Sequence, residues 1–334
     1  MAKWRHGLTI GKFYPPHRGH KHLIDTAQGM VDKLTVIVCD HPTQSISGEL
    51  RGAWLREIHP DAEVLVVPDT LPDDRSDLWA EFTIELLGQA PDVVFTSEDY
   101  GESYARFLGC DNVVVDKQRV SVPCSGTQIR NAPLSHLDFL EPCVRANFVK
   151  RICVIGAEST GTTTMAEALA EHFQTAWVPE YGREYWIWKV ERGEVDRWTS
   201  EEFLAIAVEQ ARREDEAART ANKVLICDTD PFATSIWHER YLRSRFEPLD
   251  RFADSRHYDL YLLTGNDIPF VQDGFRDGEH IRDWMHGRFV EELTRTGRRF
   301  VSLCGPHEER LATAVGGVEG VLERGLSHET WRGI

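Results

Sequence analysis

The stretch GKFYPPHRGH, residues 11–20, decides the fold of the first half of the chain. Residues 8–10 before it predict a short buried strand, and the apolar spacing in residues 20–31 predicts a helix. The stretch is therefore a turn between a strand and a helix. Because the first amides of a helix have no partner within it and carry partial positive charge, such a turn can hold an anion.

The composition of this turn favours a phosphate ligand. Gly11 and Gly19 allow close approach of the backbone, and the two prolines stiffen the turn. His17 and His20 are three positions apart, so both imidazoles can face one ligand. An ordinary turn with surface histidines is the alternative interpretation.

All ten residues fit the pattern G-x-F-x-P-x-H-x-G-H, which resembles the signature of the HxGH nucleotidyltransferase superfamily. The resemblance implies that His17 and His20 stabilise charge on the phosphates of ATP. A substrate phosphate then attacks the α-phosphorus, and pyrophosphate leaves. The other positions of the stretch expected at the ATP are Gly11, Lys12, Phe13 and Gly19.

Length and composition indicate a globular protein with two domains. The chain has 334 residues, of which 41% are hydrophobic and 28% charged. Its net charge of -16 disfavours non-specific binding of nucleic acid, because cations to neutralise the phosphates are not in excess. Seven cysteines without a CxxC pair indicate reduced core residues.

The sequence shows no targeting or membrane segment. No apolar run approaches the roughly 20 residues of a membrane span, and the first residues lead straight into a strand without a signal peptide. We therefore expect a cytoplasmic protein with neither a membrane nor a nucleic-acid partner.

Strands and helices alternate strictly through residue 96, which predicts a doubly wound parallel sheet. Ligands of such sheets bind beyond the carboxyl ends of the strands, where the loops 40–51, 68–79 and 97–101 should converge on the first turn. Trp79 is a candidate to stack on a flat heteroaromatic ring, and a core position is the alternative. Arg51 can hold a substrate phosphate, although a solvent-exposed arginine would look the same.

Residues 122–130, VPCSGTQIR, form a second phosphate-binding pattern. Ser125 is a favourable helix N-cap, and Arg130 follows just over one turn later. The segment resembles the superfamily's ISSTxxR signature, which Ser125, Thr127 and Arg130 match. Cys124 and Gly126 depart from it, at little cost because the expected contacts are a hydroxyl, backbone amides and a guanidinium.

The second half begins with a strand at residues 151–155, followed by GAESTGTTT, residues 156–164, and a helix. This is the context of a P-loop, in which backbone amides cradle phosphates and a hydroxyl holds magnesium. Thr162 stands where the P-loop lysine is expected, and its cation is therefore missing. The positions expected to bind nucleotide are Gly156, Ser159, Gly161, Thr162 and Thr163, with Mg²⁺ as the cofactor.

Asp228 ends a strand at residues 224–227 in the manner of a Walker-B acid, so Thr163 and Asp228 are the expected metal ligands. Arg276 and Arg282 lie in a glycine-containing segment that could close over a nucleotide. They are our candidates to replace the missing lysine.

With both signatures present, the chain resembles the NadR family of nicotinamide mononucleotide adenylyltransferases fused to a ribosylnicotinamide kinase. The likeness also covers SEDYG, GAESTG, EYGREY, DTDPFAT and DIPFVQDGFRD. It implies two α/β domains with doubly wound parallel sheets. Residues 1–146 would be a Rossmann-like HxGH nucleotidyltransferase, and residues 147–334 a P-loop kinase-like domain.

The resemblance implies that the first domain makes NAD from ATP and nicotinamide mononucleotide. The second would phosphorylate nicotinamide riboside, with Glu180 or Asp228 accepting the proton of the ribose hydroxyl. Some members carry an N-terminal helix-turn-helix. Since the first strand begins within eight residues of Met1, we expect no DNA binding here.

Other interpretations stay open. The protein could be an adenylyltransferase alone, whose second domain is a nucleotide-binding relic or a sensor that regulates the first. A different acceptor such as phosphopantetheine would suit HxGH but leaves the kinase-like half unexplained. A homo-oligomer is possible.

Overall fold

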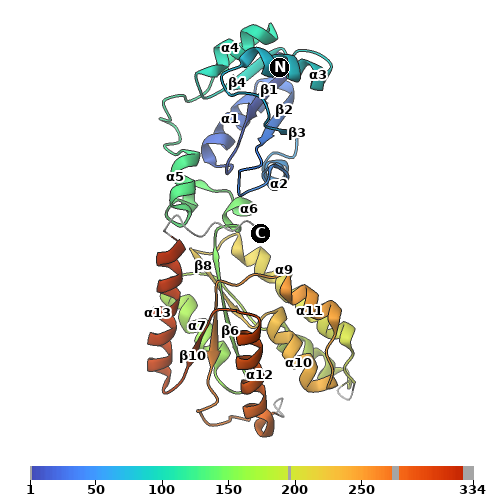
Figure 1. Cartoon of the computed structure of the whole chain (residues 1–334), viewed down its shortest axis with the longest axis vertical. Coiled ribbons are helices and arrows are strands. Elements are labelled where there is room, and N and C mark those ends of the chain that lie inside the picture. Colours follow the sequence, from blue (N-terminus) through green and yellow to red (C-terminus); the bar gives the residue numbers. More distant parts are fainter. Residues whose placement is uncertain (1, 195–196, 273–277, 326–334) are drawn as a thin grey trace. The chain divides into compact units, whose positions relative to one another are not determined.

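The computed structural model describes residues 2–194, 197–272 and 278–325. The chain forms two compact units, which divide between Val144 and Arg145 (Figure 1). Each unit contains one five-stranded sheet, and every strand pair within both sheets is parallel. None of the helices in the described ranges is long and apolar enough to cross a membrane.

The sheet of the first unit has the strand order β3-β2-β1-β4-β5. Its central strand β1 lies between β2 and β4, so the strand order reverses there and opens a crevice beyond the carboxyl ends. The strands are β1 (Trp4–Gly11), β2 (Val31–Asp40), β3 (Glu63–Pro68), β4 (Val93–Thr96) and β5 (Asp111–Val114).

Helices cover both faces of this sheet because successive strand residues point to opposite sides. Val36 and Val38 of β2 pack in one core with α1 (Arg18–Gln28) and α2 (Gly48–Ile58). Ile37 and Cys39 pack in the other with α3 (Ser76–Leu87) and α4 (Tyr100–Leu108). The predicted doubly wound arrangement is confirmed.

The first helix is shorter than predicted. It ends at Gln28, and Val31 is the first residue of β2. Val31 packs in the same core as α1, so apolar spacing alone did not distinguish the strand from the helix. Residues 133–145 form three short helical pieces, η1 (Pro133–Ser135), η2 (Leu137–Phe139) and α6 (Pro142–Arg145).

The sheet of the second unit has the order β10-β9-β6-β8-β7. Its strands are β6 (Lys150–Gly156), β7 (Trp177–Val178), β8 (Val224–Asp228), β9 (Leu260–Thr264) and β10 (Phe300–Leu303). One face packs against α7 (Thr162–Phe173) and α13 (His307–Gly325). The other packs against α9 (Ser200–Ala218), α10 (Pro231–Leu242), α11 (Glu247–Asp254) and α12 (Arg282–Arg295).

Helix α9 begins with a capping box, in which Thr199 and Glu202 exchange side-chain and backbone hydrogen bonds. Not all of the charged residues of this helix are exposed to solvent. Glu214 is completely buried and accepts a hydrogen bond from the Tyr258 hydroxyl at 2.6 Å. Burial raises the pKa of Glu214 to about 7, against the opposing effects of Tyr258 and Arg151.

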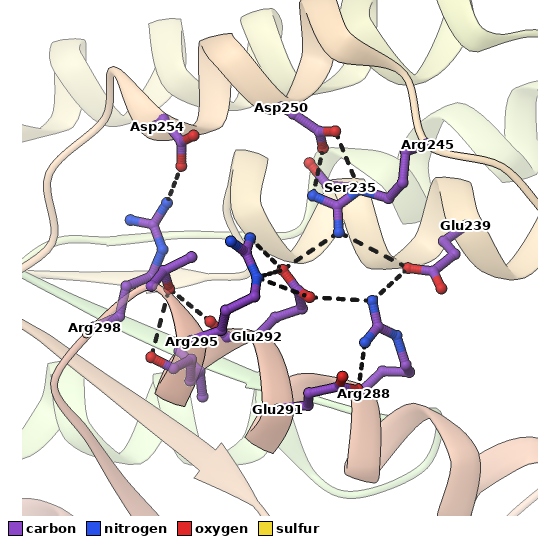
Figure 2. A network of polar contacts seen from close by, with 12 residues as sticks. Ser235, Glu239, Arg245, Asp250, Asp254, Arg288, Glu291, Glu292, Arg295 and Arg298 are labelled. Carbon is purple, nitrogen blue, oxygen red and sulfur yellow. Dashed lines mark hydrogen bonds and ion pairs between the residues drawn. The ribbon is translucent and has the colours of Figure 1, made fainter.

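Figure 2 shows the ion-pair network that joins α12 to α10 and to the α11 region. Glu292 is its centre, because Arg245, Arg288 and Arg295 all lie within 3.3 Å of its carboxylate. The side chain of Glu292 is 7% exposed. The network therefore fixes α12, whose first residue is Arg282, against the rest of the unit.

Candidate functional site

A cavity of about 520 Å³ lies at the carboxyl ends of the strands of the first unit. Both predicted phosphate-binding patterns line it, together with Asp69 and Asp73 of the loop before α3 and Ser97 and Glu98 after β4. None of the described residues 40–51 lines it, so one of the three predicted loops is wrong. The predicted residues that do line it are Gly11, Lys12, Phe13, His17, Gly19, His20, Trp79, Ser125, Thr127 and Arg130.

His17 is the N-cap of α1, and its Nδ1 accepts hydrogen bonds from the amides of Gly19 at 3.1 Å and His20 at 3.4 Å. An accepting Nδ1 is unprotonated, so the proton of the neutral ring is on Nε2. A Cβ at Gly19 would lie 2.9 Å from the His17 ring, which explains why glycine occupies this position.

The two imidazoles stack, with centroids 3.7 Å apart and planes 25° apart. Phe13 packs edge-on against His20 at 5.0 Å. Burial lowers the pKa of His17 to about 4, and burial with the neighbouring His17 lowers that of His20 well below 6.5. Both rings are therefore neutral near neutral pH and can act as hydrogen-bond donors to an anion.

Short helix α5 (Gly126–Asn131) begins at the second pattern. Ser125 caps it by accepting from the amide of Gln128 at 3.2 Å. Arg130 donates to the carbonyl of Tyr14 at 2.6 Å and to the hydroxyl of Thr127 at 3.0 Å. One guanidinium thereby joins the two patterns, which are more than a hundred residues apart in the sequence.

Lys12 and Trp79 lie on the side of the cavity formed by the loop before α3. The ammonium of Lys12 is 3.0 Å from Asp73 and 3.6 Å from the buried Asp69. Burial acts to lower the pKa of Lys12, but the two carboxylates outweigh it and raise the pKa. The indole of Trp79 donates to the carbonyl of Pro72 at 3.2 Å and is 8% exposed, so it belongs to both core and cavity wall.

The structure contradicts the expectation that Arg51 holds a substrate phosphate. Its side chain is completely buried and does not line the cavity. The guanidinium donates to the carbonyls of Lys12, Cys39 and Ile46, and it pairs with Asp40 at 2.7 Å. These bonds occupy its donors in holding the turn 11–20 to the end of β2.

Arg119 is a cation of the cavity that the sequence did not predict. It has a positive φ of 53° and lies in a loop held by Asp116, whose carboxylate accepts from the amides of residues 120–122 at 2.8 to 3.1 Å. Its charge lowers the pKa values of His17 and His20. Within the described ranges its guanidinium makes no hydrogen bond or ion pair, and the residue lines the cavity.

A second cavity, of about 200 Å³, lies at the P-loop of the second unit. The Thr163 hydroxyl donates to Asp228 at 2.6 Å. Burial raises the pKa of Asp228 to about 6, opposed by the hydroxyls of Thr163 and Thr162 and the charge of Arg183. The predicted residues that line this cavity are Gly156, Ser159, Gly161, Thr162, Thr163, Glu180 and Asp228.

Arg282 does not have its predicted role. It is absent from the cavity lining, and its Nη2 donates to the carbonyls of Ile268 at 3.0 Å and Ser159 at 3.4 Å. The Ser159 hydroxyl accepts from the amide of Val271 at 2.8 Å. Arg282 therefore stabilises the P-loop through hydrogen bonds made outside the cavity. Arg276 lies outside the described residues.

Aromatic side chains form a wall of the second cavity, which the sequence did not predict. Trp186 and Trp198 stack with centroids 5.7 Å apart and planes 23° apart. The wall comes from α8 (Tyr181–Glu191), α9, α10 and the segment just before α9, which contains Trp198, so no short motif marks it. Its members are Trp186, Trp198, Phe203, Trp237 and Tyr241.

The second cavity offers donors that suit a divalent metal. Among the described residues no three His, Cys, Asp or Glu side chains gather into a metal site. The Thr163 hydroxyl and Asp228 carboxylate are nevertheless the pair of protein oxygens that P-loop enzymes place at the metal, whose other ligands are phosphate oxygens and water. The residues present therefore fit a metal that arrives with ATP.

Comparison with known proteins matches residues 8–132 to the cytidylyltransferase-like family and residues 151–310 to an AAA domain. The chain is 30% identical over 324 residues to the trifunctional NAD biosynthesis/regulator protein NadR of Escherichia coli (strain K12). The alignment covers 88% of this chain and 78% of that protein. The chain belongs to the NadR family. NadR of Salmonella typhimurium (strain LT2) matches equally well, at 30% over 325 residues.

Two solved NadR structures share the fold. NadR in complex with NR has a TM-score of 0.80, and NadR in complex with NAD and AMP-PNP has 0.76. Each is 22% identical and covers 97% of both chains. The family resemblance and the fold class predicted from the sequence are therefore confirmed.

Proposed function

We propose that this NadR-family protein makes NAD by transferring the adenylyl group of ATP to nicotinamide mononucleotide. We further propose that its second unit phosphorylates nicotinamide riboside with ATP. Family membership supports both activities, as do the solved complexes of related NadR proteins with NR and with NAD and AMP-PNP. We assign the first activity to residues 1–146 and the second to residues 147–334.

One observation carries the adenylyl transfer: the stacked histidines at the start of α1 and the Ser125 cap of α5 line the same cavity. Both helix starts place the positive end of a helix dipole at the cavity, although His17 itself accepts from the amides of Gly19 and His20. An oxygen of the mononucleotide phosphate attacks the α-phosphorus, and the bond to the oxygen of pyrophosphate breaks. Neutral His17 and His20 donate hydrogen bonds to the charge that develops, as do Thr127, Arg130 and the ammonium of Lys12.

The acceptor lies on the opposite side of the cavity, at the loop before α3. Trp79 offers an aromatic face for the nicotinamide ring, and its bond to Pro72 fixes the orientation of the indole. The Asp69 carboxylate, 6% exposed, lines the same cavity. Phosphopantetheine, the other acceptor considered, lacks the flat ring that such a wall would bind.

In the second unit, the ribose hydroxyl oxygen forms a bond to the γ-phosphorus, and the bond from that phosphorus to the oxygen of ADP breaks. The proton of the hydroxyl passes to the carboxylate of Glu180 or Asp228. The aromatic wall and the P-loop line the same cavity, which suits a flat base whose ribose points toward the phosphates.

Mg²⁺ is the metal we propose, held by Thr163 and Asp228 together with phosphate oxygens. It would neutralise charge on the β- and γ-phosphates. Location in the cytoplasm and assembly into homo-oligomers stay predictions.

Parallel reactions test both activities. Purified protein with magnesium-ATP receives nicotinamide mononucleotide in one tube and nicotinamide riboside in the other, and NAD is followed by chromatography. We expect NAD in both. NAD from the mononucleotide alone would refute the kinase and support the alternative of a relic or sensor. NAD from neither tube would refute the adenylyltransferase, and H17A should lose product in both tubes while still phosphorylating riboside.

A further inference from the structure

The P-loop of the second unit lacks its usual cation, because Thr162 occupies that position. Phosphoryl transfer is catalysed mainly by charge placed around the transferring phosphate, so an active kinase needs a positive group from elsewhere. The Thr162 hydroxyl acts on Asp228 and cannot provide it. The cation has to come from another element that faces the same cavity.

Three arginines near the loop are engaged with the loop itself. Arg282 donates to the carbonyl of Ser159, and Arg310 donates to the carbonyl of Thr160 at 3.0 Å. Arg240 pairs with Glu158 at 2.9 Å and is 5% exposed. Their guanidinium groups stabilise the loop conformation and are absent from the cavity lining. None of the three is therefore placed to bind a phosphate.

Arg183 has the placement that the others lack. Among the described residues that line this cavity, it is the one lysine or arginine. It is an exposed residue in the first turn of α8. Thr163 and Asp228 line the same cavity. Glu180 precedes Arg183 at the N-cap of the same helix.

We propose that Arg183 takes the place of the missing P-loop lysine and binds the phosphate that is transferred from ATP. The inference rests on the kinase activity proposed above. One turn of α8 then supplies both groups that flank the reaction, with Glu180 on the side of the attacking hydroxyl and Arg183 on the side of the phosphate. A guanidinium suits this role because it can bind two phosphate oxygens at once.

The test combines removal of Arg183 with restoration of the lysine. We expect R183A to lower kcat for riboside phosphorylation by about 100- to 1,000-fold, the usual cost of removing one group that stabilises developing charge. In the double variant T162K/R183A, the new lysine should raise kcat at least about tenfold above that of R183A. R183K should retain intermediate activity, and R192A, at the other end of α8, should behave as the unmodified protein.

Adenylyl transfer by the same preparations is the control for folding, since it belongs to the first unit and should not change. If R183A retains the kcat of R192A, the proposal is wrong. It is also wrong if R183A is inactive and T162K does not recover activity, because Arg183 would then be needed for some other reason.

A binding measurement separates this inference from the kinase proposal. In an H17A background, which weakens the ATP contacts of the first unit, calorimetric titration compares ATP with ADP. R183A should reduce affinity for ATP more than for ADP, and T162K should reverse that difference. If unmodified protein phosphorylates no riboside, the kinase proposal fails. The same ATP-specific effect would still support Arg183 as the phosphate-binding cation, whereas equal affinities in R183A and R192A would refute it.

Discussion

The imidazoles of His17 and His20 stack at 3.7 Å, a distance at which two positive charges would repel strongly. The pKa of His17 is about 4 through burial, with Arg119 and Arg130 adding to the effect, and that of His20 is also well below 6.5. The free protein therefore presents a neutral pair to its substrates.

A pH profile tests this neutrality. Because both folded-state pKa values lie below 6.5, the neutral pair persists as pH falls through 6.5 and is lost only toward about 4. We expect kcat/KM for adenylyl transfer, which reports on the free enzyme, to show no inflection near 6.5. Measurement with purified nucleotides between about pH 5 and 8 is sufficient. An inflection near 6.5 that disappears in H17N would show that the pair is charged at lower pH.

Arg119 provides a second prediction. Since Arg119 lines the cavity and its loop is held by Asp116, R119A should lower kcat/KM for adenylyl transfer by about 10- to 100-fold. R119K should have an intermediate kcat/KM, because an ammonium keeps the positive charge but cannot donate two parallel hydrogen bonds to a phosphate as a guanidinium does. K117A is the matched control, since Lys117 pairs with the exposed Asp99 outside the cavity. Equal rates for R119A and K117A would exclude a role in phosphate binding.

The sequence predicted the residues whose chemistry depends on fixed spacing along the chain. His17 and His20 belong to one turn, and Ser125 to Arg130 to another, so a local pattern suffices to find them. The parallel sheets also follow from local alternation of strands and helices. These features depend on the backbone near each residue and little on the rest of the fold.

The residues that the sequence missed depend on contacts between distant elements. Arg119 lies in a turn whose left-handed positions are occupied by Asp116 and Arg119 itself, so glycine does not mark it. Arg51 was misassigned because burial against the ends of other strands cannot be read from its neighbours. The aromatic wall of the second cavity comes from three helices and the segment before α9, and its rings look like ordinary core residues in sequence.

Arg51 should prove important for stability and not for substrate affinity. R51M keeps much of the side-chain volume but removes the donors to the carbonyls of Lys12 and Cys39. Unpaired buried groups each cost about 1–3 kcal/mol, so we expect a loss of several kcal/mol in the free energy of unfolding of the first unit. Urea titration measures it, with E49A on the same helix as the control. A raised KM for the mononucleotide without loss of stability would instead support the predicted binding of a substrate phosphate by Arg51.

The final prediction concerns Glu292, the centre of the network in Figure 2. Hydrogen bonds from Arg295 lower its pKa to about 2, against the effect of burial and with the help of Arg245. Because the folded-state pKa lies below the ordinary 4.5, the carboxylate contributes stability that is fully present above 4.5 and lost as pH falls toward about 2. E292Q should therefore destabilise the second unit most at neutral pH, by about 3–5 kcal/mol.

E291Q is the matched comparison, because Glu291 is 65% exposed and pairs with Arg288 alone among the described residues. We expect it to change the free energy of unfolding by less than about 1 kcal/mol. Urea unfolding of both variants at neutral pH and near pH 4 should show the penalty of E292Q shrinking in acid while that of E291Q stays small. A penalty for E292Q that is the same at both pH values would mean that its packing, and not its charge, stabilises α12.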